Sequence, residues 1–359
     1  MRRLRHCVPG PGRRLKTAKA LGLTMSPSLV ARATRWREFI TAVMPWLATS
    51  LPVFPGVAFA QSSLPVVAIL RATGDESANV NRLFRQAARE IGHEDGRTIR
   101  IIEYSAQNDI NRLAGLSAVV VAERPAVVVA MGPAAARAMK AASSSVPIVA
   151  FTSFPVESGL AASLARPGGN LTGVSLITTE LDAKRLSLLG EFIPNAKRIA
   201  VLRDPAVSAA DHIPQLEATA RSLGVALEIV EANRPDAIGA AVQLARSHGV
   251  EALSVLASPM LNGAASEIAR QAKRANLPTM CQWREMAEAG CMVSYGASFA
   301  EAYRLTAAQM DRVLRGANPA ELPIQQPTRF ELVVNLTTAR ELGLVFSASL
   351  LARADELIE

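Results

Sequence analysis

Short apolar runs alternate with amphipathic stretches between residues 65 and 314. The apolar runs are rich in Val and Ile and predict buried strands, whereas the stretches between them have helical periodicity. Strands are predicted at Val66–Leu70, Thr98–Glu103, Ala126–Ala130, Ile148–Phe151, Leu171–Val174, Arg198–Leu202, Ala226–Val230, Ala252–Leu256, Thr279–Cys281 and Met292–Ser294. Helices are predicted at 76–91, 109–123, 133–142, 178–190, 208–222, 236–247, 262–275 and 298–314.

This alternation predicts an α/β fold with parallel sheets that are covered by helices on both faces. One large sheet is an alternative, but two sheets of about five strands fit the length of 359 residues better. The turn-forming segment Arg166–Asn170 marks the expected break between the two halves.

The formal charge of +8 is concentrated at the N-terminus. Residues 1–60 hold ten basic residues and one acidic residue, Glu38, so the rest of the chain has a net charge of −1. The basic surface expected of a nucleic-acid-binding protein is therefore absent from residues 61–359.

The basic N-terminal segment has the pattern of a signal peptide. Arginines between residues 32 and 37 precede the apolar run Phe39–Phe59, and Ala58-Phe59-Ala60 resembles a cleavage site. We expect residues 1–60 to be a leader that directs export to the periplasm. Three prolines interrupt the apolar run, which argues against the alternative of a membrane anchor. Initiation at Met25 would leave residues 1–24 untranslated, and both general secretion and twin-arginine export stay open.

Two cysteines, Cys281 and Cys291, follow the leader. Export would permit a disulfide between them, and two buried free thiols are the alternative that we favour.

Motifs for catalysis are absent from the sequence. His93, His212 and His248 are not spaced like metal ligands, and there is no G-x-S-x-G elbow, phosphate loop or dinucleotide fingerprint. We therefore expect no enzyme activity, no cofactor and no metal. An α/β enzyme stays an alternative, because convergent active sites need no motif.

Polar residues follow several predicted strands, at the edge where open α/β sheets bind ligands. Gly132 begins the corner before the helix at 133–142, Thr152 and Ser153 follow the next strand, and Asp204 and Ser258 follow strands of the second half. Asp204 could accept from an ammonium group, and the Gly132 corner with Thr152 and Ser153 could hold a carboxylate. Alternatively, Asp204 and Thr152 only cap the following helices.

From about Val66 to its C-terminus, the chain resembles the ABC transporter substrate-binding proteins of the tryptophan/tyrosine transport-system type. The segments that carry the resemblance are Arg166–Ser175, Glu180–Leu186, Arg198–Leu202, Trp283–Glu285, Ser294–Gly296, Leu322–Asn335 and Ser349–Ile358. They are long and occur in order, so the resemblance is specific to the family.

The resemblance implies a type I periplasmic-binding-protein fold, with two Rossmann-like lobes joined by a hinge of three crossovers. Residues 61–175 and 297–326 would form the first lobe, and residues 176–296 and 327–359 the second. The ligand would lie between the lobes. The residues expected to bind it are Arg71, Gly132, Thr152, Ser153, Glu180, Asp204, Ser258 and Tyr295.

The resemblance further implies that the protein captures a small solute and delivers it to an ABC permease and its ATPase. The expected solute is amino-acid-like, with aromatic amino acids as the lead, and the expected binding protein is a monomer. A periplasmic sensory module is an alternative, and a transcriptional repressor of the same fold is less favoured. Many relatives have Asp where this chain has Phe154, before Pro155 and Val156, so an apolar ring replaces a charge and the identity of the solute stays open.

Overall fold

The computed structural model describes residues 64–74, 78–176, 179–207 and 212–359. The predicted leader lies outside these residues. Parallel strands form a first, five-stranded sheet in the order β2-β1-β3-β4-β5. The strands of this sheet are β1 (Val66–Arg71), β2 (Arg100–Ser105), β3 (Val127–Met131), β4 (Ile148–Ser153) and β5 (Leu171–Leu176).

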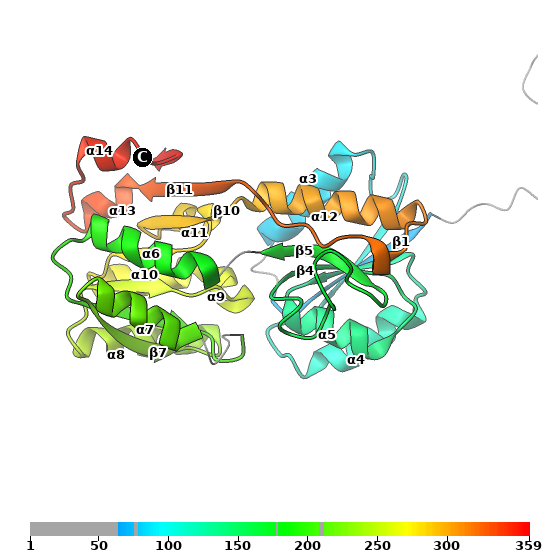
Figure 1. Ribbon diagram of the computed structural model, residues 1–359, viewed down its shortest axis with the longest axis horizontal. Helices are drawn as coiled ribbons and strands as arrows, with labels where there is room; N and C mark the ends of the chain where they lie inside the picture. The colour runs from blue at the N-terminus through cyan, green and yellow to red at the C-terminus, as the bar shows by residue number, and fades with distance from the viewer. Residues whose placement is uncertain (1–63, 75–77, 177–178, 208–211) are drawn as a thin grey trace, which may run out of the picture. The chain divides into compact units, whose positions relative to one another are not determined.

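Helices cover both faces of the first sheet (Figure 1). Helices α3 (Ala78–Glu90) and α12 (Phe299–Leu314) pack on one face, whereas α4 (Arg112–Ala122) and α5 (Pro133–Ala142) pack on the other. Alternate strand residues divide between the two faces, as Val67 and Ile69 join the first core and Ala68 and Leu70 the second. Both faces are therefore buried, which explains why the strand sequences are apolar at successive positions.

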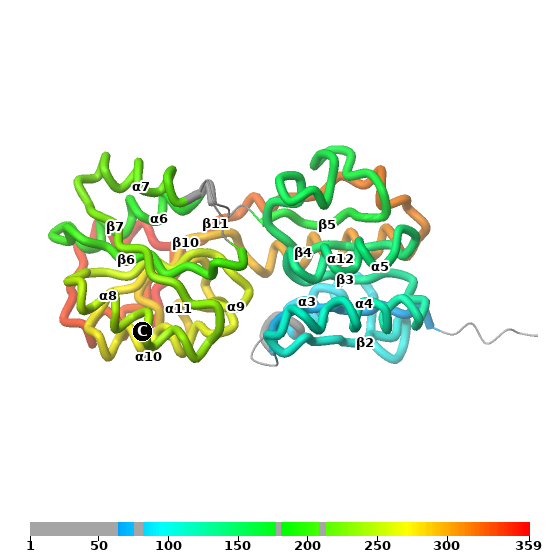
Figure 2. Tube along the Cα trace, turned by 90° about the horizontal axis from the view of Figure 1, so that it is seen from below, coloured from blue at the N-terminus to red at the C-terminus, as the bar shows by residue number. Residues whose placement is uncertain are grey.

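The second sheet has seven strands in the order β12-β11-β10-β9-β8-β6-β7. They are β6 (Arg198–Arg203), β7 (Ala226–Glu231), β8 (Ala252–Val255), β9 (Thr279–Cys281), β10 (Val293–Ala297), β11 (Phe330–Asn335) and β12 (Glu356–Ile358). Helices α6 (Thr179–Phe192) and α7 (His212–Ser222) cover one face, and α8 (Ile238–Ser247) and α10 (Ala265–Arg274) cover the other. Figure 2 shows these helices grouped with β6–β11, apart from the helices of the first sheet.

The second sheet differs from the prediction in two respects. Strands β11 and β12 were not among the predicted strands, and β11 runs antiparallel to β10. The sheet thus holds seven strands where about five were expected, and it is mixed where a parallel sheet was expected. The short helices α13 (Leu336–Glu341) and α14 (Ala348–Leu351) connect β11 to β12.

The chain passes between the sheets after β5, between β10 and α12, and again before β11. The last two connections are tied together, because the Glu301 carboxylate accepts hydrogen bonds from the backbone N–H groups of Thr328 (3.1 Å) and Arg329 (2.8 Å). Gln325 pairs with Val174 beside β5. The exact boundaries of the two lobes stay a prediction.

Cys281 and Cys291 are both buried and free. Burial, together with the neighbouring Cys291 thiol, raises the pKa of Cys281. Within the described residues, the helices are too short or too polar for any of them to span a membrane.

Candidate functional site

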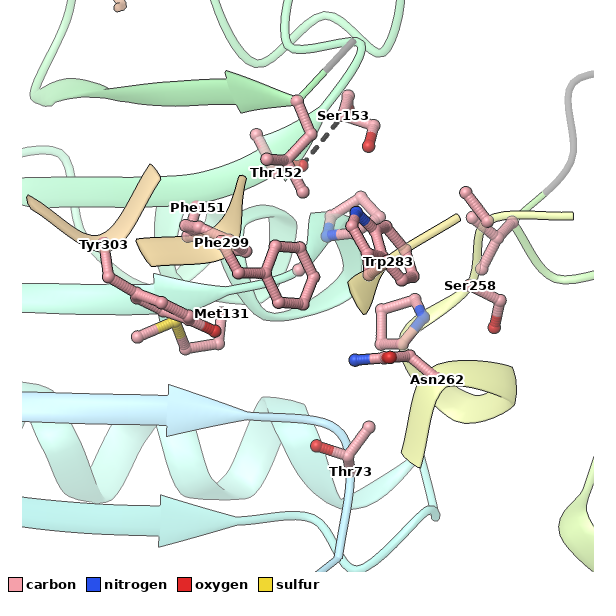
Figure 3. A pocket seen from close by; sticks show the side chains of 16 residues that line it. Thr73, Met131, Phe151, Thr152, Ser153, Ser258, Asn262, Trp283, Phe299 and Tyr303 are labelled. Carbon is pink, nitrogen blue, oxygen red and sulfur yellow. Dashed lines mark hydrogen bonds between the residues drawn. The ribbon is translucent and has the colours of Figure 1, made fainter. Parts of the chain in front are cut away.

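A pocket lies where the strand-to-helix corners of the two sheets approach each other (Figure 3). Its empty volume is about 650 Å³, which includes space open to solvent. The first sheet contributes residues after β1 and at the ends of β3, β4 and β5, and the second sheet contributes residues that follow β6, β8 and β9. The carboxyl ends of the strands therefore form the site, as expected for open α/β sheets.

Aromatic side chains form one wall of this pocket (Figure 3). Phe151 and Tyr303 stack in parallel with their ring centroids 4.7 Å apart, and Trp283 stacks on Phe299 at the same distance. The Phe299 ring also meets Phe151 edge to face at 5.8 Å. Burial and the nearby Glu285 raise the pKa of the Tyr303 hydroxyl, so this wall is uncharged at neutral pH. It offers flat apolar surface to an aromatic or aliphatic group.

The corner after β3 is built around Gly132, which has a φ of +92°. This left-handed conformation favours glycine. The Gly132 N–H donates to the Phe151 carbonyl (2.7 Å), and Pro133 begins helix α5. A Cβ atom at Gly132 would lie 3.3 Å from Cγ of Pro259, which belongs to the corner after β8. Gly132 therefore permits a close approach between corners of the two sheets.

Thr152 and Ser153, at the end of β4, also line the pocket (Figure 3). Thr152 is buried, and its hydroxyl donates to the Ser153 carbonyl at 3.2 Å. The Ser153 side chain is partly exposed.

Asp204 and Ser258 join the corners after β6 and β8. The Ser258 hydroxyl donates to Oδ2 of Asp204 (2.7 Å), and Oδ1 of Asp204 accepts from the Ala206 N–H (3.0 Å). Ser258 also caps helix α9 (Pro259–Gly263) by accepting from the Met260 N–H at 3.1 Å. Both side chains are buried, so they stabilise the corners whether or not they contact a solute.

A second compartment of about 1250 Å³, also partly open to solvent, adjoins the aromatic one. The residues that line both are Thr73, Met131, Gly132, Pro133, Val207 and Pro259. Among the described residues, Arg137 and Asp204 are the charged ones that line the second compartment, whereas the aromatic compartment has no charged lining residue. The cleft thus joins an aromatic part to a charged part.

Of the remaining predicted residues, Arg71 and Tyr295 do not line these two compartments. Arg71 is buried and paired with Glu103 (3.1 Å). Tyr295 packs against Phe330, and its carbonyl accepts from Nε of Arg185 at 2.7 Å. Glu180 lies in the first turn of α6, but the structure does not describe its side chain. Their roles in binding stay predictions.

Sequence reasoning missed the aromatic wall and Arg137. Trp283 and Phe299 follow the ends of strands β9 and β10, as Asp204 follows β6, but they were missed because only polar residues at such positions were selected. Tyr303 and Arg137 lie inside helices, and no sequence signal distinguished them from core and surface residues.

Within the described residues, no group of three or more His, Cys, Asp or Glu side chains could hold a metal ion. His93 pairs with Asp311 (2.8 Å), and His248 pairs with Glu228 (2.8 Å), both outside the cleft.

Several solved structures share the fold of this chain. The chain superposes on a conserved domain protein from Vibrio cholerae with a TM-score of 0.76 and 24% identity, covering 82% of this chain and 100% of that one. It superposes on an ABC domain in complex with L-Trp from Streptococcus pneumoniae with a TM-score of 0.75 and 22% identity, with the same coverage. The fold is therefore that of type I periplasmic binding proteins, as the resemblance implied.

Sequence comparisons identify the family. The tyrosine-binding protein of Clostridioides difficile is 26% identical over 266 residues, which is 73% of this chain and 75% of the relative. The family model described as ABC transporter substrate binding protein matches residues 67–358. Because that match spans most of the chain, the protein belongs to the ABC transporter substrate-binding protein family.

Proposed function

We propose that this protein captures an amino acid with an aromatic side chain between its two lobes and delivers it to an ABC importer. The observation that carries the proposal is the composition of the cleft. Its aromatic compartment suits an apolar ring, and the adjoining compartment has the charges of Arg137 and Asp204. An aromatic amino acid has the same division into a ring and a zwitterionic end.

The relatives support this choice of solute. One is a tyrosine-binding protein, and a structure of the same fold contains L-Trp. In our proposal, the Asp204 carboxylate binds the ammonium group, because it is the negatively charged group among the described residues that line the cleft. Gly132, Thr152 and Ser153 contact the solute from the first sheet.

Solute binding would favour a closed arrangement of the lobes. A solute that contacts both lobes stabilises the state in which all of its contacts are made, and closure removes it from water. The connections on either side of α12 would form the hinge, with residues 61–175 and 297–326 in one lobe and the remainder in the other. The permease and its ATPase would act on the closed form.

The site of action that we propose is the periplasm, reached by export with the leader of residues 1–60. The protein would act there as a monomer, without nucleic acid as a partner. The nearly neutral charge of residues 61–359 agrees with this role.

The proposal is tested by a thermal-shift screen of the exported protein against amino acids, small carboxylates, nucleosides and sugars. A ligand that binds the folded state at 100 times its Kd stabilises it by about 2.7 kcal/mol. We expect Tyr, Trp or Phe to raise the melting temperature. A shift with sugars or nucleosides alone would refute the proposed solute class.

Asp204→Asn tests the ammonium contact. The amide removes the negative charge and keeps one acceptor oxygen, so its NH2 group faces either the Ser258 hydroxyl or the Ala206 N–H. We expect Kd to rise at least about tenfold and the free energy of unfolding to fall by about 1–3 kcal/mol. Isothermal titration calorimetry measures the Kd. An unchanged Kd would leave Asp204 with only its role in the corners.

A further inference from the structure

The hydrogen-bond donors that the sequence suggested for a solute carboxylate are largely used within the protein. The Gly132 N–H donates to the Phe151 carbonyl, and the Thr152 hydroxyl donates to the Ser153 carbonyl. Pro133 has no N–H, and the Ser258 hydroxyl donates to Asp204. None of these groups, nor the Ser153 hydroxyl, has a positive charge, so a carboxylate that enters the cleft can form an ion pair only with a different residue.

Arg137 has the charge that such a carboxylate needs. It lies on α5, four residues after Pro133, so both residues are on the same face of the helix, and both line the second compartment. Among the described residues that line the cleft, it is the only one with a positive charge.

The surroundings leave the Arg137 guanidinium available. Its side chain is exposed, and no ion pair or hydrogen bond joins it to another described residue. The opposite is true of Arg71, which is buried and paired with Glu103. A guanidinium presents a planar set of donors that matches a carboxylate with two parallel hydrogen bonds.

We propose that Arg137 binds the carboxylate of the solute and makes the protein selective for aromatic amino acids whose carboxylate is free. This inference rests on the proposed function and adds a specificity-determining residue to it. The ring lies in the aromatic compartment, the ammonium group meets Asp204, and the carboxylate meets Arg137. Derivatives in which a carboxamide replaces the carboxylate lose this ion pair and bind weakly.

The test is calorimetric titration of the exported protein with L-tyrosine, L-tryptophan and L-phenylalanine and with the α-carboxamide of each. We expect the wild type to bind at least one of the acids about 10- to 100-fold more tightly than its amide, as for other hydrogen bonds between charged groups. This comparison needs no substitution. Arg137→Gln should weaken binding of that acid by a similar factor and abolish its preference over the amide, and Arg137→Lys should restore part of the preference.

Arg246→Gln is the matched control, because Arg246 is an exposed helical arginine on α8 that does not line the cleft. It removes the same charge and should leave both Kd values unchanged. A wild type that binds acid and amide equally, or an Arg137→Gln variant that keeps the preference, overturns the role of Arg137 and leaves the proposed function intact. A wild type that binds none of the six compounds overturns the proposed solute class and this inference with it.

Discussion

At Gly132, the addition of one methyl group should change both stability and binding. The φ of +92° is unfavourable for alanine, and the new Cβ would lie 3.3 Å from Pro259. We expect Gly132→Ala to lower the free energy of unfolding by about 1–2 kcal/mol. It should also weaken solute binding, because Pro259 must move away from the corner. Chemical denaturation and calorimetry measure the two effects.

Gly190→Ala provides the control for this substitution. Gly190 lies inside α6, its φ is not in the left-handed range, and nothing lies within 4 Å of the added Cβ. Alanine there should raise the free energy of unfolding by about 0.5–1 kcal/mol. If both substitutions changed the free energy of unfolding by the same amount, the φ of Gly132 and its contact with Pro259 would not limit that position to glycine.

The buried carboxyl of Glu285 should make stability depend on pH. Burial raises its pKa to about 6 from an ordinary value of 4.5, and Oε2 has no hydrogen-bond partner among the described residues. The charged neighbours are Glu288, Arg284 and Glu331, and Tyr303 lies near as well. A raised pKa means that the stabilisation present below pH 4.5 is lost as pH rises through about 6.

Glu285→Gln keeps a neutral side chain at every pH and should remove this loss. Its stability relative to the wild type should therefore rise by about 1–2 kcal/mol between pH 4 and pH 7. Denaturation at a series of pH values measures the difference. Glu157→Gln, at an exposed position in the turn after β4, is the control and should show no such rise. If the difference in the free energy of unfolding between Glu285→Gln and wild type did not change with pH, the buried carboxyl of Glu285 would not be the cause of a pH dependence.

The sequence was informative about cleft residues that follow strands, and uninformative about those inside helices. Gly132, Asp204 and Ser258 follow strands, and the structure places all three along the cleft. Tyr303 stacks on Phe151 from a helix more than a hundred residues further along the chain. Such a contact depends on how α12 packs against the first sheet, which local patterns do not encode.

At the scale of elements, Glu301 in the first turn of α12 connects this helix to the segment before β11. Although burial opposes the shift, hydrogen bonds from the N–H groups of Arg329 and Thr328 lower the pKa of Glu301. The Thr328 hydroxyl donates to the same carboxylate at 3.0 Å. Glu301→Gln should therefore lower the free energy of unfolding at pH 7 by about 1–3 kcal/mol.

A lowered pKa gives this effect a definite dependence on pH. The stabilisation by Glu301 is present above the ordinary value of 4.5 and is lost as pH falls through the lower folded-state pKa. The difference between wild type and Glu301→Gln should therefore shrink in acid, as followed by denaturation. Glu217→Gln, at an exposed position of α7, is the control. A difference that grows in acid would contradict the role of the ionised carboxylate.

Elements were predicted correctly where neighbouring residues in the sequence determine them, and were missed where distant strand pairing determines them. Helix α5 begins at Pro133 as predicted, because proline is favoured in the first turn of a helix. Strand β11 was missed although Leu332–Asn335 is buried, and its antiparallel pairing with β10 follows only after α12 has intervened. Strand β12 has three residues, too few for a recognisable period.

At the scale of the whole molecule, the alternation of strands and helices predicted sheets covered on both faces, and the chain length favoured two sheets over one. Strands buried on both sides must be apolar throughout, so their sequence reports the layer arrangement directly. The division into five and seven strands was not predictable in this way. The second sheet has seven strands because β11 and β12 join it after the chain has returned from α12. Their place in the sheet is determined by pairing between strands that are far apart in the sequence.

The same arrangement predicts a change of shape when solute binds. The cleft is lined by corners of both sheets, so a bound solute gains contacts with the second sheet only when the lobes approach each other. Small-angle X-ray scattering of the exported protein should therefore show a smaller radius of gyration at saturating L-tyrosine or L-tryptophan than without solute. An amino acid that gives no thermal shift is the control and should leave the radius unchanged. If a bound aromatic amino acid left the radius unchanged too, recognition would occur without closure, and the importer would have to read a surface other than the closed form.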